Sequence, residues 1–162
     1  MKPIPLLGTL VTAALTACSS DPVSPGLAQL VGRWRAPTET LQPHGTMDGR
    51  LIVDADAEIE DHVISRGLYP NQSSADLSAH QVLYGHIAVR EDKFVIHPDS
   101  LVTMDIFYGP THRHVQRDFS GWPRDSTQYQ IRANELHLEY YSYPADAPVL
   151  TRRVLYRFPW SR

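Results

Sequence analysis

The sequence of 162 residues contains one cysteine, Cys18, so no disulfide can form within the chain. A core without disulfides must come from packing alone, and a chain of this length is large enough to build one as a single domain. Because there is no second thiol, cysteine-based metal centres and dithiol redox chemistry are excluded.

Positive charge is also scarce. The chain has 15 lysines and arginines against 18 acidic residues, which gives a formal net charge of −3. Proteins that bind nucleic acids need an excess of cations to neutralise phosphates, so a nucleic-acid partner is not expected.

The strong catalytic signatures are missing as well. The sequence has no Gly-x-Ser-x-Gly, no glycine-rich phosphate loop and no His-Glu-x-x-His. We therefore expect no resident cofactor or metal, and the sequence favours a non-catalytic role over an enzyme.

The first 17 residues have the three parts of an export signal. Lys2 gives a positive start, and residues 6–15 form an apolar core that is too short to span a bilayer. The stretch LTAC that ends at Cys18 resembles the bacterial lipobox. The resemblance implies a diacylglycerol on the Cys18 thiol and an acyl chain on its amino group after cleavage. Stable anchoring takes two such chains, because one gives only marginal binding.

Cleavage by the ordinary signal peptidase is the alternative. That peptidase prefers small residues at positions −3 and −1 before the cut. A cut after Ala17 places the large Leu15 at −3, and a cut after Thr16 places Ala14 and Thr16 at these positions, which meets the preference only in part. The resemblance to lipoproteins further implies that Ser19, directly after the lipidated cysteine, permits transport to the outer membrane, where the domain would face the periplasm. We expect residues 18–31 to be a lipidated tether and residues 32–162 to be the folded domain.

From residue 32 onward, apolar residues alternate with polar ones, which is typical of strands. Leu51, Val53 and Ile59 share one face of a single predicted strand that runs through an acidic stretch. Tight turns are expected at residues 91–92 and 133–134. The sequence predicts an all-β antiparallel meander that closes into a small up-and-down barrel, with a two-sheet sandwich as the alternative.

The stretch LVGRWR, residues 30–35, resembles the Gly-x-Trp motif of lipocalin-like barrels. That resemblance implies that Trp34 closes the base of the barrel and that Arg157, from the last strand, lies across it. Strict alternation gives a conflict, because it places Val154, Tyr156 and Phe158 on the apolar face and Arg157 opposite them. A bulge in the last strand is then required.

Two polar motifs have residue types that occur in metal sites. His112 and His114 are spaced to face one way on a strand and begin a zinc site, for which a third ligand is needed; solvated strand residues are the alternative. The candidates for that third ligand are His97, His137 and Asp118. The acidic stretch at residues 54–60 fails as a calcium loop, because Ile59 and Ser65 stand where glycine and glutamate are needed.

Aromatic residues gather late in the chain, at positions 129, 140, 141, 143, 156, 158 and 160. They either line a cavity for a small apolar ligand or cap a filled core. The sequence thus leaves two functions open for an anchored envelope lipoprotein. One is binding of a small apolar ligand, and the other is docking of an envelope protein partner through a sheet edge or face of a filled barrel.

Overall fold

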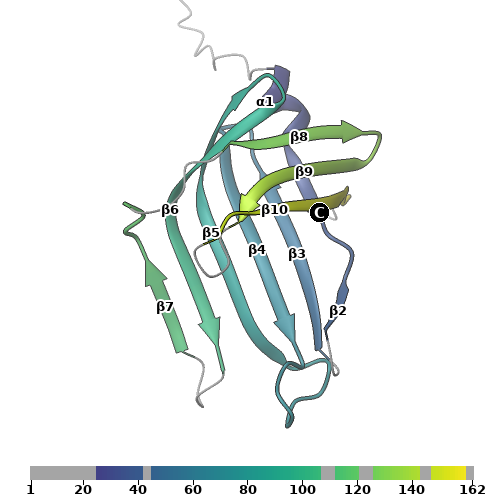
Figure 1. The fold of residues 1–162 in the computed structure, drawn as a ribbon, viewed down its shortest axis with the longest axis vertical. Helices are drawn as coiled ribbons and strands as arrows, with labels where there is room; N and C mark the ends of the chain where they lie inside the picture. Colours follow the sequence, from purple (N-terminus) through teal and green to yellow (C-terminus); the bar gives the residue numbers. More distant parts are fainter. Residues whose placement is uncertain (1–24, 42–44, 107–111, 121–125, 143–146, 160–162) are drawn as a thin grey trace, which may run out of the picture.

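The computed structural model describes residues 25–41, 45–106, 112–120, 126–142 and 147–159 (Figure 1). Cys18, and with it the predicted lipidation site, lies outside these residues. The elements in chain order are α1 (Pro25–Leu30), β1 (Gly32–Arg35), β2 (Glu39–Leu41), β3 (Gly45–Val53), β4 (Glu58–Arg66), β5 (Leu77–Arg90), β6 (Lys93–Asp105), β7 (His112–Gln116), β8 (Thr127–Arg132), β9 (Glu135–Ser142) and β10 (Val149–Arg157).

The predicted all-β antiparallel meander is confirmed. Eight strands are hydrogen-bonded in the order β1-β10-β9-β8-β6-β5-β4-β3, and β3 pairs with β1 to complete a ring. The ring is uneven, because β6 meets β8 at two residue pairs and β1 meets β10 at two. The fold therefore combines a closed small barrel with two crossed layers, as in a sandwich.

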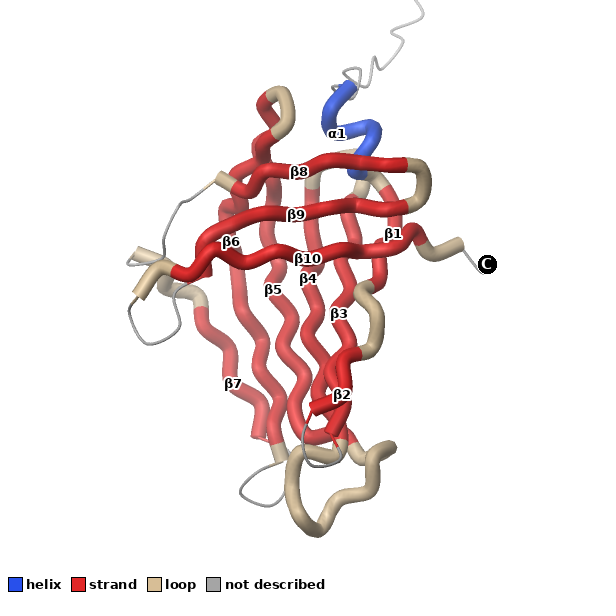
Figure 2. The backbone as a smooth tube through the Cα atoms, turned by 45° about the vertical axis from the view of Figure 1, so that its right-hand side comes forward, coloured by secondary structure: helices blue, strands red, loops and turns tan. Residues whose placement is uncertain are grey.

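The layers cover each other only in part. Strands β8, β9 and β10 cross over the upper halves of β3–β6, and nothing in the described residues crosses over the lower halves (Figures 1 and 2). These lower halves, residues 45–49, 61–66, 77–83 and 101–105, are widened by the edge strands β2 and β7. We call this part of the sheet the open wing.

The hydrophobic core lies where the two layers overlap. Its buried residues are Leu27, Leu30, Trp34, Leu51, Val53, Ile59, Ile87, Phe94, Tyr129, Leu136, Leu138 and Leu155. The space left between the apolar side chains of α1, β3, β4, β5 and β6 is too small for a water molecule. The core of the barrel is filled by its own side chains.

Helix α1, which lies in the segment expected to be the tether, contributes two residues to this core. Leu30 is fully buried and Leu27 nearly so, which places apolar side chains of α1 in the core before the first strand begins at Gly32. Proline suits the first helical position because the missing N–H has no partner there. A side chain at Gly26 would collide with Val89 and with the Tyr129 hydroxyl, so glycine allows the helix to approach the barrel.

The single strand predicted across residues 51–59 is wrong. The chain turns back at residues 54–57, and β3 and β4 form a hairpin. The Asp54 carboxylate accepts hydrogen bonds from the backbone N–H groups of Asp56 and Glu58, both at 2.9 Å, and Ala57 has a φ of 65°. The alternation was misleading because Val53 and Ile59 sit opposite each other and face the same core.

Candidate functional site

Trp34 and Arg157 lie against each other. They are cross-strand partners of β1 and β10, and the guanidinium carbon of Arg157 is 4.6 Å from the centre of the Trp34 ring. The indole N–H donates to the backbone oxygen of Leu30 at 2.8 Å, and Arg157 donates to the backbone oxygen of Gln29 at 3.0 Å. Both contacts fasten α1 to the end of the barrel.

The expected phase of β10 is wrong. Leu155 is fully buried and shares its face with Arg153 and Arg157, whereas Tyr156 and Phe158 are about half exposed. Arg157 thus reaches Trp34 by plain alternation, and no bulge is needed. The inward phase carries Thr151 and two arginines beside Leu155, so the register with β9, and not hydrophobicity, decides which phase turns inward.

Arg153 ends the core on the side of the open wing. It donates to both carboxylate oxygens of Asp61 on β4, at 2.9–3.1 Å, and it lies beside Tyr140. Burial lowers the pKa of Arg153, but the attraction of Asp61 outweighs this and leaves the pKa above its ordinary value. The guanidinium passes so close to β3 that a side chain at Gly49 would lie 2.8 Å from it.

The late aromatic residues that the structure describes divide between the core and the surface. Tyr129 is buried and its hydroxyl donates to the backbone oxygen of Glu91. Tyr140 is partly buried against the core, whereas Tyr141, Tyr156 and Phe158 point to solvent. The described members of this group therefore fill the core rim or cover the outside of the barrel.

Exposed apolar side chains gather on one part of the surface. The described residues include six exposed large hydrophobic side chains, and five of them lie on β9, on β10 or just after it. We call these five the β10 patch, and each is 45–52% exposed: Tyr141, Val149, Leu150, Tyr156 and Phe158. Val149 and Leu150 are consecutive in β10 and point to opposite faces, so the patch borders the strand on both sides. Exposed apolar residues gathered in this way are typical of interaction sites.

The same strand has a free edge. Strand β10 pairs with β9 along its whole length, but with β1 only at Tyr156 and Arg157. Between Val149 and Leu155, no strand in the described part of the chain occupies the side away from β9. Arg157 donates its N–H to the backbone of Asn134 beside β9, so by alternation Leu150, Arg152 and Val154 direct their backbone groups to the free side.

A polar groove of about 490 Å³ runs beside the patch. Its lining includes Gln128, Gln130, His137, Glu139 and Arg152. Glu139 accepts a hydrogen bond from Arg152 at 2.7 Å, so the charges in the groove are partly balanced. Polar groups beside exposed aromatic residues are the usual composition of a protein–protein interface.

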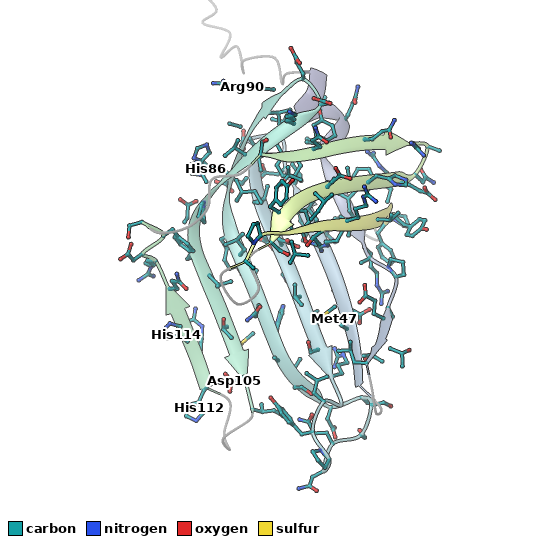
Figure 3. The ribbon with its side chains drawn as sticks, viewed as in Figure 1. Met47, His86, Arg90, Asp105, His112 and His114 are labelled. Atoms are coloured by element: carbon teal, nitrogen blue, oxygen red, sulfur yellow. The ribbon has the colours of Figure 1, made fainter. Side chains whose placement is uncertain are left out.

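The histidine pair of β7 gains no third ligand. His112 and His114 are exposed on this edge strand, and Asp105 is the cross-strand neighbour of His112 (Figure 3). His97 stacks on His86, and His137 binds Glu135. The expected ligands are thus dispersed, and no three histidine, aspartate or glutamate side chains among the described residues are placed to hold a metal ion.

Sequence reasoning missed the free edge, the patch and a contact between His62 and His80. Two members of the patch, Tyr156 and Phe158, are expected on the apolar face of the last strand, and the other three have no assigned face. His62 and His80 lie on neighbouring strands, so only the strand register brings them together. No local motif marks any of the three.

No protein-family model matches the chain, and no curated protein matches it either. The helical residues that the structure describes form no segment that is both long and apolar enough to cross a membrane.

Proposed function

We propose that this chain is a lipid-anchored protein of the bacterial envelope that docks a protein partner on the β10 patch and along the free edge of β10. Cys18 carries the lipid, and the outer membrane, facing the periplasm, is the proposed location. The domain acts as a rigid, filled scaffold and not as a container for a small ligand.

The observation that carries the docking proposal is the position of the exposed apolar residues. Five of the six described large hydrophobic side chains that are exposed lie at or beside one strand, and that strand has an unpaired edge. An extended segment added at such an edge gains main-chain hydrogen bonds, while its side chains contact the apolar residues of the host strand.

The open wing supports the same mode of binding. Strand β10 is the last strand of the layer that crosses β3–β6, so an added strand would continue that layer over the wing (Figure 1). The wing face that continues from the core carries the apolar residues Met47, Val63, Leu83 and Leu101, all of which are partly exposed. An added strand would bury part of this surface as well.

The anchoring proposal is supported by the lipobox resemblance of LTAC. The described residues begin with α1 at one end of the molecule, and the open wing lies at the other end (Figure 1). A chain tethered through residues before α1 leaves the wing and the edge of β10 accessible to a partner.

Site-specific photo-crosslinking of the full chain in its own host tests the docking proposal. A photoreactive phenylalanine analogue replaces Tyr141 in one variant and Asp56, an exposed turn residue, in the control. We expect one discrete protein adduct from position 141, none from position 56, and loss of the adduct when Leu150→Asp is added.

Three results would contradict the proposal. One is equal adducts from both positions, and another is no protein adduct from position 141. The third is an adduct with the mass of two copies of this chain, which would replace an envelope partner by self-association. Native mass spectrometry that finds a small molecule retained by the purified protein would favour the ligand-binding alternative.

A further inference from the structure

His62 and His80 form a close pair on the outer face of the sheet, away from the β10 patch. His62 is on β4 and His80 is on β5, one step apart diagonally across the ladder. The Nδ1 atom of His62 lies 3.1 Å from the Nε2 atom of His80, and the two ring planes are within 25° of each other. The rings thus meet edge to edge through their nitrogen atoms.

Glu60 sets the orientation of this pair. Its carboxylate lies 3.0 Å from Nε2 of His62, which therefore carries the proton and donates it to Glu60. The Nδ1 atom of His62 is left with a free lone pair that faces His80. A carboxylate bound to the far nitrogen of a histidine is the usual outer support of a metal-ligating imidazole.

We propose that His62 and His80 chelate a divalent transition-metal ion of the copper or nickel type. With both nitrogens at about 2.0–2.1 Å from the metal and at their present separation, the N–metal–N angle would be roughly 100°. This angle is close to that of neighbouring ligands in square-planar and tetragonal sites, which Cu²⁺ and Ni²⁺ prefer with nitrogen ligands.

Binding needs no net loss of protons. The Nε2 proton of His80 moves to Nδ1 of the same ring, so the lone pair of Nε2 becomes free to bind the metal. His62 keeps the proton on its Nε2 atom and continues to donate it to Glu60. Water fills the remaining positions, because no third histidine, aspartate or glutamate in the described residues is close enough to join the pair.

The surrounding charges set limits on the site. Burial is the largest cause that lowers the pKa of His80, and the neighbouring His62, Arg50 and Arg66 lower it further, which favours the neutral form of this ligand. Arg50 and Arg66 also repel a cation. Glu60 opposes them, and Arg66 is held by a hydrogen bond of 3.0 Å to the backbone oxygen of Ala75.

Titration of Cu²⁺ into the untagged full chain in detergent micelles tests the chelate, with electron paramagnetic resonance as the readout. We expect one tetragonal Cu²⁺ centre with nitrogen ligands, and about tenfold or greater weakening in both His62→Gln and His80→Gln. Glu60→Gln should also weaken binding, because the loss of an outer-shell carboxylate typically costs about 10–100-fold in metal affinity.

The control is the double variant His112→Gln/His114→Gln, which removes the exposed histidine pair of β7 and should leave the Cu²⁺ signal unchanged. A second measurement follows the reaction of histidines with diethylpyrocarbonate. Ni²⁺ should protect His62 and His80 and leave His112 reactive. The chelate is disproved if the β7 variant abolishes binding, if His80→Gln binds like the wild type, or if the wild type gives no nitrogen-ligated signal.

Discussion

Arg153 of β10 and Asp61 of β4 are joined by three hydrogen bonds of 2.9–3.1 Å across the two layers of the barrel. Both side chains are about one-fifth exposed, so the pair is largely shielded from water. It is the last contact of the core before the open wing. The pair therefore holds β10 over β4 at the place where a partner strand would be added.

Removing one member of this pair should lower the free energy of unfolding more than replacing both. Asp61→Ala leaves an uncompensated guanidinium in the barrel, and we expect it to lower the free energy of unfolding by about 3–5 kcal/mol. The double variant Asp61→Leu/Arg153→Met replaces both charges by apolar groups and should cost much less. Urea unfolding followed by circular dichroism compares the two, and equal losses would contradict this account.

The turn residues with positive φ give a second prediction. Ala57 has a φ of 65°, a region that costs residues with a Cβ roughly 1–2 kcal/mol and that glycine adopts freely. We expect Ala57→Gly to stabilise the protein by about 0.5–1 kcal/mol, since the lost strain exceeds the added entropy of the unfolded chain. The measurement is the shift of the thermal midpoint.

Ala88→Gly is the matched control for this turn. Ala88 is exposed near the end of β5, where glycine only adds freedom to the unfolded chain. We expect Ala88→Gly to lower the free energy of unfolding by about 0.5–1 kcal/mol. A loss at both positions would show that the turn at Ala57 is not strained.

The sequence was sufficient to predict the parts of the fold that depend on local rules. The turns at residues 91–92 and 133–134 were predicted because each separates two alternating runs, and both are present. Within the second hairpin, Tyr129, Leu136 and Leu138 are buried as their alternation requires.

The parts that depend on register could not be predicted. The outward phase of β10 is the more apolar of the two, so only pairing with β9 could show that Leu155 points inward and Tyr156 outward. The turn after Val53 was hidden, because the acidic residues 54, 56 and 58 continue the period of two. For the same reason the contact between His62 and His80, 18 positions apart, has no signature in the sequence.

The lowered pKa of His80 makes stability depend on pH. Burial is its largest cause, and the pKa lies below the ordinary value of 6.5 that the unfolded chain keeps. The unfolded chain therefore binds more protons near and below pH 6.5, and stability falls as the pH drops through the lowered pKa of the folded state. The contribution of His80 is fully present above pH 6.5.

Urea unfolding at pH 7.5 and at pH 5.5 measures this effect. We expect the wild type to be less stable at pH 5.5, and His80→Gln to lose part of that difference. His112→Gln, at an exposed position, should keep all of it. If His80→Gln keeps the full difference, the pH dependence arises elsewhere.

Lipid attachment at Cys18 gives a prediction about location. Cys18→Ala removes the thiol that a lipobox cysteine uses, so it should lose incorporation of a fatty-acid analogue in growing cells. The variant should also leave the membrane fraction, because it carries no acyl chain to hold it there. Equal labelling of the wild type and the variant would refute the lipobox interpretation, and labelling with retention in the inner membrane would refute only the proposed outer-membrane location.

Variants at the free edge of β10 can distinguish two modes of docking. In one the partner adds a strand through main-chain hydrogen bonds, and in the other it contacts only the exposed apolar side chains. Leu150 directs its N–H away from β9, so Leu150→Pro removes an edge donor without removing a bond of the β9 ladder. Leu150→Val keeps both the donor and an apolar side chain, so it serves as the matched control. In the crosslinking assay at position 141, we expect the proline variant to lose the adduct and the valine variant to keep it, with unfolding midpoints close to each other. If both variants keep the adduct, the partner binds the exposed side chains alone and adds no strand to β10.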